Sequence, residues 1–156
     1  MGTRSLTKVI TTWEDTNGKK QRKPITCMYR QYDGYLDGHG LELAEWLNQY
    51  TIVNGIGMDE TRKIANGMGC LSAQIVAYLK EAPGDFYLHS AGTRDIGEEF
   101  IYTLYYTEEL NIKVQDTYDD GHNLFDGNIK AYKNWINPQI NPTNQGKSKD
   151  QECFFI

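Results

Sequence analysis

An Asn-Gly pair between two alternating, β-branched segments constrains the fold of this chain more than any other feature. Residues 5–13 and 24–32 both alternate between apolar and polar side chains, and the polar stretch between them contains Asn17-Gly18. Asn and Gly tolerate the positive φ angles of a tight turn, so the two segments are expected to pair as an antiparallel hairpin. A hairpin at the start of the chain favours a sheet that is antiparallel and has one face available for helices.

The rest of the chain adds strands and helices to this hairpin. A second hairpin is predicted at residues 100–107 and 111–118, and a short strand at residues 86–90. Apolar residues at helical spacing predict helices at residues 41–50, 70–82 and 128–136, with a short extra helix at residues 59–64. The order ββ-αα-βββ-α predicts an α+β fold, in which the helices pack on one face of an antiparallel sheet.

The length predicts a single domain. Its 156 residues can bury a sizeable core, and we expect one domain over residues 1–136. Residues 137–156 are rich in Asn, Pro, Gln and Lys and predict a polar tail with an apolar C-terminus. No run approaches the roughly 20 apolar residues that span a membrane, and no signal peptide is expected.

The net charge and the distribution of cysteines limit the classes of binding partner and the cellular compartment that the sequence predicts. The formal net charge of −5 argues against broad binding to duplex nucleic acid, which requires a basic face. Cys27, Cys70 and Cys153 are scattered without a Cys-x-x-Cys spacing, which favours free thiols in a reducing cytoplasm over disulfides or zinc. Eleven tyrosines supply flat apolar rings with polar tips, which suit ligand pockets, subunit interfaces or a Tyr-rich sheet.

The candidate ligand site is the glycine-rich loop between the second strand and the first helix. Arg30 ends the strand, and arginine forms two parallel hydrogen bonds to phosphate or carboxylate. Tyr32 and Tyr35 can stack on a base, Asp33 belongs to an Asp-Gly turn, and His39 lies just before the predicted helix. The alternative is that the Asp-Gly pairs only form turns and that His39 only caps the helix.

Three further residues complete the predicted ligand site. Arg4 opens the first strand and is expected at the same end of the sheet as Arg30, although a surface role is an alternative. His89 and Arg94 lie in a second polar stretch, but its spacing matches no catalytic triad or nucleophile motif. The three histidines lack metal-ligand spacing. We therefore expect no metal, no cofactor and no catalytic residue.

Several motifs resemble those of a family of small, uncharacterised bacteriophage proteins. The segments are MGTRSLT at residues 1–7, MYRQYDGY at residues 28–35, the Gly-His-Gly at residues 38–40, LAEWL at residues 43–47 and LFDG at residues 124–127. The resemblance spans roughly residues 1–136. It implies a phage protein acting in the bacterial cytoplasm, and it supplies no catalytic residue to transfer.

This resemblance leads to three functional hypotheses. Small acidic phage proteins often counter host defences, and one class sequesters nucleotide-derived immune signals, often as homo-oligomers. Arg and Tyr on a glycine-rich loop provide the charge and the flat ring that such a ligand requires. The first hypothesis is therefore a binding protein for a small nucleotide-like ligand. The others are a nucleotide hydrolase or phosphodiesterase with His39 or His89 as general acid or base, and an inhibitor of a host defence protein.

Overall fold

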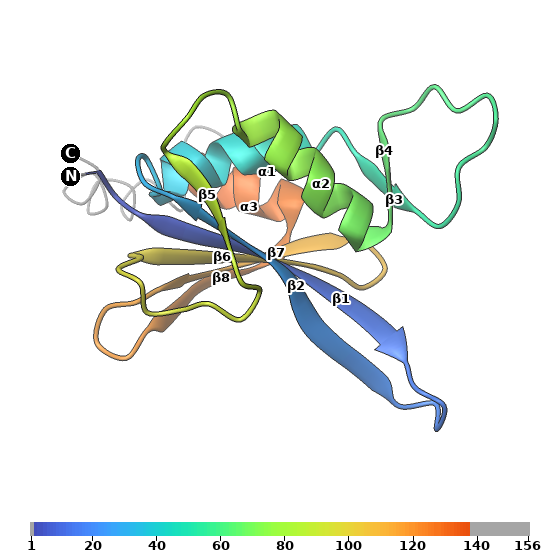
Figure 1. Cartoon of the computed structure of the whole chain (residues 1–156), viewed down its shortest axis with the longest axis horizontal. Helices are drawn as coiled ribbons and strands as arrows, with labels where there is room; N and C mark the ends of the chain where they lie inside the picture. Colours follow the sequence, from blue (N-terminus) through green and yellow to red (C-terminus); the bar gives the residue numbers. More distant parts are fainter. Residues whose placement is uncertain (1, 138–156) are drawn as a thin grey trace.

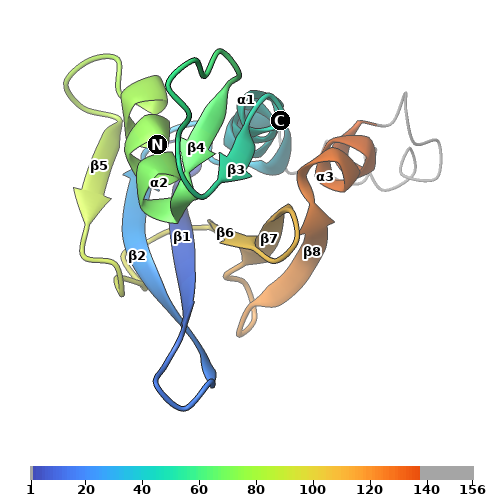
Figure 2. The ribbon, with the colours of Figure 1, turned by 90° about the vertical axis from the view of Figure 1, so that its right-hand side faces the viewer.

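A computed structural model describes residues 2–137, which form a six-stranded sheet with helices on one side (Figures 1 and 2). The strand order in this sheet is β5-β2-β1-β6-β7-β8, and β3 and β4 form a separate two-stranded sheet. The elements are β1 (Ser5–Glu14), β2 (Lys20–Arg30), the π-helical turn η1 (Leu36–Gly40), α1 (Leu41–Leu47), β3 (Thr51–Val53), β4 (Ile64–Asn66), α2 (Gly67–Leu79), β5 (Phe86–His89), β6 (Phe100–Tyr106), β7 (Leu110–Asp116), β8 (His122–Asn128) and α3 (Ile129–Ile136).

Both predicted hairpins are confirmed. β1 pairs antiparallel with β2, and β6 pairs antiparallel with β7. Gly18 has a φ of 77° in the first turn, which glycine adopts without the steric penalty that a Cβ atom brings. The predicted class, a mixture of helices with a mostly antiparallel sheet, is therefore correct.

The predicted order of elements is wrong in two regions. The segment predicted as a helix at residues 59–64 is instead a projecting loop that ends in β4, which pairs in parallel with β3. The segment before the last helix is a full strand, β8, and not a connection. Asp119, Asp120 and Gly121 all have positive φ and turn the chain from β7 into it. The loose apolar spacing of residues 59–64 is compatible with either a helix or a loop, and the Asp-Asp-Gly turn can lead into either a strand or a connection. Packing against the rest of the chain therefore selects the structure of both segments.

A parallel pairing at the centre of the sheet was not predicted. β1 lies between β2 and β6, and it pairs in parallel with β6 from Ser5↔Phe100 to Val9↔Leu104. β5 forms the edge next to β2, so the chain crosses the sheet between β5 and β6 through residues 90–99. This crossover carries no helix and covers the face opposite the helices, where the Cys27 thiol lies 3.8 Å from the carbonyl oxygen of Thr93.

The core lies between the sheet and the helices. Alternation along β1 directs Ser5, Thr7 and Val9 toward the helices, and the cross-strand register places Met28 and Tyr102 beside Thr7. Within residues 2–137, no helix is both long and apolar enough to cross a bilayer. Except for its first residue, Asn137, the predicted polar tail lies outside the described residues.

Candidate functional site

A fully buried histidine joins the glycine-rich loop to the central strand. His39 lies in η1, and its Nε2 atom is 2.6 Å from Oγ1 of Thr7 on β1. Its Nδ1 atom is 3.1 Å from Nη1 of Arg30 at the end of β2. The three elements β1, β2 and η1 therefore meet at one imidazole ring.

The contacts of His39 define its protonation state. A guanidinium only donates hydrogen bonds, so Nδ1 accepts from Arg30 and the ring proton is on Nε2, which donates to Thr7. Burial, and then the positive charge of Arg30, lower the pKa of His39 to about 3. The ring is neutral at physiological pH, and both its nitrogens are engaged. His39 is therefore a positioning residue that holds Arg30.

Two buried tyrosines hold the same loop against the core. The hydroxyl of Tyr102 on β6 donates to the carbonyl of Gly34, and that of Tyr132 on α3 donates to the carbonyl of Leu36, each at 2.7 Å. A Cβ atom at Gly40 would lie 2.8 Å from Cε1 of Tyr102 and would also collide with the hydroxyl of Tyr132. The loop has the small residues and the carbonyls that let these rings approach, so its glycines serve packing as well as turns.

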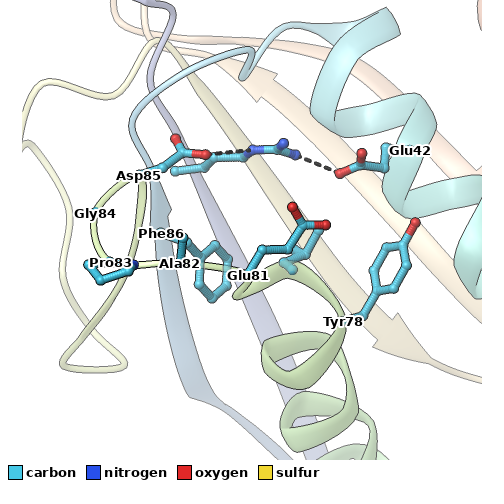
Figure 3. Close-up of a pocket in the computed structure, with 10 residues that line it drawn as sticks. Glu42, Tyr78, Glu81, Ala82, Pro83, Gly84, Asp85 and Phe86 are labelled. Atoms are coloured by element: carbon cyan, nitrogen blue, oxygen red, sulfur yellow. Dashed lines mark hydrogen bonds and ion pairs between the residues drawn. The ribbon is translucent and has the colours of Figure 1, made fainter.

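Arg30 forms one wall of a cleft between α1 and the segment after α2. Its Nη1 donates to Oε1 of Glu42 at 2.8 Å, and its Nε lies 4.0 Å from Oδ2 of Asp85. Figure 3 shows Glu42 and Asp85 at opposite ends of this ion-pair network, with Tyr78 and Glu81 beside it. We call this cavity of about 200 Å³ the Arg30 cleft.

One nitrogen of the Arg30 guanidinium has no partner among the described residues. The Arg30 side chain is only 17% exposed, yet its Nη2 makes no hydrogen bond or ion pair with any residue between 2 and 137. The flanking Glu42 and Asp85 hold the planar group in place. The result is an oriented donor at a cleft wall, next to carboxylates that accept hydrogen bonds from hydroxyl or amino groups.

An aromatic platform adjoins the Arg30 cleft. The rings of Trp46 and Tyr78 are stacked, with centroids 4.9 Å apart and planes 15° apart. Both rings line a second hollow of about 410 Å³, which shares Glu42 and Tyr78 with the Arg30 cleft. Burial, and then nearby carboxylates that include Glu42, raise the pKa of Tyr78, so its hydroxyl stays protonated and can donate.

The other predicted loop residues surround this site without entering it. Tyr32 is 46% exposed, and its backbone N–H donates to Oδ1 of Asp85. Asp33 has a φ of 58°; its carbonyl accepts from the backbone N–H of His39 and its carboxylate from the hydroxyl of Tyr35. None of these three lines the Arg30 cleft. Asp33 and Tyr35 shape the loop that presents Arg30 and His39.

Arg4, His89 and Arg94 belong to the opposite side of the sheet. Arg30 pairs with Ser5, so Arg4 is at the same end of the sheet as expected, but alternation directs its side chain to the other face. There its guanidinium packs against Gly97, and its buried Nε has no hydrogen-bond partner among the described residues. His89 lies beside Tyr29 on edge strand β5, and Arg94 lines a separate hollow of about 640 Å³ with Lys8.

Several residues of the site were not selected from the sequence. Glu42 and Asp85 hold Arg30, and Tyr78 and Trp46 form the platform. Glu42 follows His39 by three residues, which is one turn of helix and was a usable signal. Asp85 and Tyr78 come from a distant segment, so only the tertiary structure brings them to Arg30.

Neither histidine of the predicted site presents a free nitrogen to the Arg30 cleft. His39 is neutral and occupied at both nitrogens, and His89 lies on the opposite face of the sheet. Within residues 2–137, no three His, Cys, Asp or Glu side chains form a group that could hold a metal ion. No protein-family model, curated protein or solved structure matches this chain. The chemistry of the residues described above therefore carries the functional proposal.

Proposed function

We propose that this chain is a bacteriophage protein that binds and sequesters a small nucleotide-derived ligand in the cytoplasm of the bacterial host. Its role is to counter a defence system that signals through that ligand, and it acts as a homo-oligomer without turnover. The phage origin and the defence context rest on the resemblance of motifs such as MYRQYDGY at residues 28–35. The binding role rests on the geometry around Arg30.

The observation that carries this proposal is the Arg30 guanidinium, which two carboxylates hold beside a stacked aromatic pair and whose Nη2 has no partner within residues 2–137. A guanidinium pairs with phosphate, carboxylates accept hydrogen bonds from ribose hydroxyls, and flat rings stack on bases. Arg30, Glu42 and the Tyr78–Trp46 pair provide these three functions side by side. The cleft takes one phosphate and its sugar, while the base lies over the platform.

The hydrolase alternative loses its main support from the same geometry. A histidine that acts as general acid or base requires a pKa near the working pH and a free nitrogen within reach of the substrate. His39 is fully buried with both nitrogens hydrogen-bonded, and its pKa is lowered to about 3. Arg30 then binds the ligand in the cleft, and His39 beside it has no free nitrogen with which to cleave the ligand.

A second candidate, an inhibitor of a host protein, is favoured by the loop between β3 and β4. This loop projects from the body of the protein (Figure 1) and exposes Ile56 at 62% and Met58 at 103% of their surface. Exposed apolar side chains on a projecting loop are typical of contact surfaces. Ile56→Ser with Met58→Ser would abolish such an interaction and leave ligand binding unchanged.

The deciding experiment is to purify the protein from bacteria with active nucleotide-based defence signalling, denature it and analyse the supernatant by mass spectrometry. An intact nucleotide-derived compound supports sequestration, a cleaved product supports the hydrolase, and an empty protein contradicts the binding proposal. Once the compound is identified, Arg30→Ala is expected to weaken its binding by about 10- to 100-fold, the value of one or more charged hydrogen bonds. Arg94→Ala, on the opposite face, is the matched control and should bind normally.

A further inference from the structure

The first hairpin extends beyond the sheet as a two-stranded arm. β6 pairs with β1 only as far as Val9, and β5 pairs with β2 only over Cys27–Arg30. Residues 10–14 and 20–24 therefore pair only with each other within the described chain. Figures 1 and 2 show this hairpin arm projecting away from the body of the protein. Both of its edges carry backbone groups that no other described strand pairs.

The two edges of the hairpin arm differ in how they are protected. The β2 edge carries Pro24, which has no N–H to donate, and proline is one of the features that prevent edge-to-edge pairing. The β1 edge reads Ile10-Thr11-Thr12-Trp13 and has neither a charge nor a proline until Glu14. These residues have high strand propensity, and Trp13 is 44% exposed. The β1 edge is therefore suited to pairing with another strand.

A groove runs along this unprotected edge. β1 and β6 diverge beyond Val9 and Leu104, and a hollow of about 970 Å³ separates the hairpin arm from the β6–β7 turn. Its walls carry both signs of charge: Lys20 and Arg22 on the arm, and Glu108 and Glu109 on the turn. A surface that carries both signs is complementary to a second copy of itself when a two-fold axis relates the copies.

We propose that the Ile10–Glu14 edge of the hairpin arm pairs antiparallel with the same edge of a second copy of this chain. The register is centred on Thr12, so Thr12 lies opposite Thr12 of the second copy and Thr11 opposite its Trp13. An aromatic ring opposite a β-branched side chain is a favourable cross-strand pair. Lys20 and Arg22 of each copy then face the acidic β6–β7 turn of the other.

This interface specifies the homo-oligomer in the proposed function, but it lies away from the Arg30 cleft and its test uses no ligand. A negative result for this interface would leave the proposal of ligand binding intact. A negative result for ligand binding would likewise leave the interface intact. The first measurement is the mass of the full chain by light scattering and native mass spectrometry. An even-numbered oligomer is expected, and a monomer would overturn the proposal.

Two substitutions then locate the interface. Thr12→Lys places two ammonium groups against each other at the two-fold axis and is expected to weaken association by about tenfold or more. Asn123→Lys makes the same change at the exposed β8 edge and should leave the oligomer intact. Circular dichroism confirms that both variants are folded. Unchanged association of Thr12→Lys, or dissociation of Asn123→Lys alone, contradicts the proposed edge.

A cross-link tests the register without weakening the interface. In the proposed pairing, the Thr12→Cys variant forms a disulfide between the two introduced thiols under mild oxidation, identified by mass spectrometry of the linked peptide. Asn123→Cys is the matched control and should remain unlinked. A disulfide between the introduced thiols of the Thr12→Cys variant supports the proposed register. A disulfide in the Asn123→Cys control without one in the Thr12→Cys variant overturns that register.

Discussion

The imidazole of His39 and the hydroxyl of Thr7 lie 2.6 Å apart at the centre of the protein, although 32 residues separate them in the sequence. This contact attaches the glycine-rich loop to the central strand, and the same ring accepts a hydrogen bond from Arg30. The loop, the sheet and the Arg30 cleft therefore depend on one buried polar network.

Thr7→Val is expected to lower the free energy of unfolding by about 1–2 kcal/mol, because it leaves the buried Nε2–H of His39 without an acceptor. Urea unfolding measures this change. Thr11→Val, on the projecting half of the same strand, is the control and should change stability by less than about 0.5 kcal/mol. Equal effects of the two substitutions would show that the hydrogen bond does not stabilise the fold.

The stability of the protein should fall on acidification because of His39. Its folded pKa is about 3, whereas the unfolded value is 6.5, so between these pH values only the unfolded chain binds the proton. The free energy of unfolding then decreases as pH falls from 6.5 toward 3, by up to about 1.4 kcal/mol per pH unit. Above pH 6.5 the ring is neutral in both states and contributes no pH dependence.

His39→Gln tests this acid sensitivity, since an amide can still donate to Thr7 and accept from Arg30 but does not titrate. Unfolding of wild type and variant is followed in urea at a series of pH values. The wild type should lose stability more steeply than the variant below pH 6.5. Parallel curves would assign the acid sensitivity to the carboxylates instead.

Gly40→Ala should destabilise the protein by about 1–3 kcal/mol, because the new methyl group meets the ring of Tyr102 and the hydroxyl of Tyr132. The control is Gly69→Ala in α2, where a Cβ atom meets open space. There the substitution should raise stability by about 0.5–1 kcal/mol, since alanine favours the helix. Thermal unfolding of both variants should therefore shift in opposite directions.

Tyr132→Phe should weaken ligand binding although Tyr132 lies outside the Arg30 cleft. The substitution removes the hydrogen bond to the carbonyl of Leu36 and should cost about 1–2 kcal/mol of stability. It should also raise the hydrogen-exchange rate of the loop from Arg30 to Gly40. Unchanged exchange in this loop would mean that packing alone holds it.

Glu42→Gln should strengthen the binding of an anionic ligand. Glu42 neutralises part of the charge of Arg30 at 2.8 Å, and an amide keeps the hydrogen bond without the negative charge. An increase in affinity of about three- to tenfold is expected at low salt, and it should shrink as salt rises. Glu45→Gln, which lines only the adjoining hollow, should have a smaller effect. Weaker binding after Glu42→Gln would show that the hydrogen bond from a ligand hydroxyl to the carboxylate outweighs the repulsion between that carboxylate and the anion.

Local patterns in the amino-acid sequence were enough to predict much of the secondary structure of this protein. Alternation over β1 and β2, the Asn17-Gly18 turn and the helical spacing of residues 70–82 correctly predicted a hairpin and a helix, because these features depend on near neighbours. The same reasoning placed Arg30 and His39 on one loop. It did not identify β8 or the β3–β4 pair, whose short segments carry no distinct periodicity.

The parallel pairing of β1 with β6 and the composition of the Arg30 cleft depend on long-range packing and could not be predicted from local patterns. Strand partners distant in the sequence are selected by shared burial, which no local pattern encodes. Neighbouring residues of a strand point to opposite faces of the sheet, and Ser5 pairs with Arg30. Arg4 therefore lies at the same end of the sheet as Arg30 but on the opposite face. Asp85 and Tyr78 reach Arg30 because helix α2 packs across the sheet. The physical reason is that local patterns set which face a side chain takes, whereas long-range packing sets which side chains meet there.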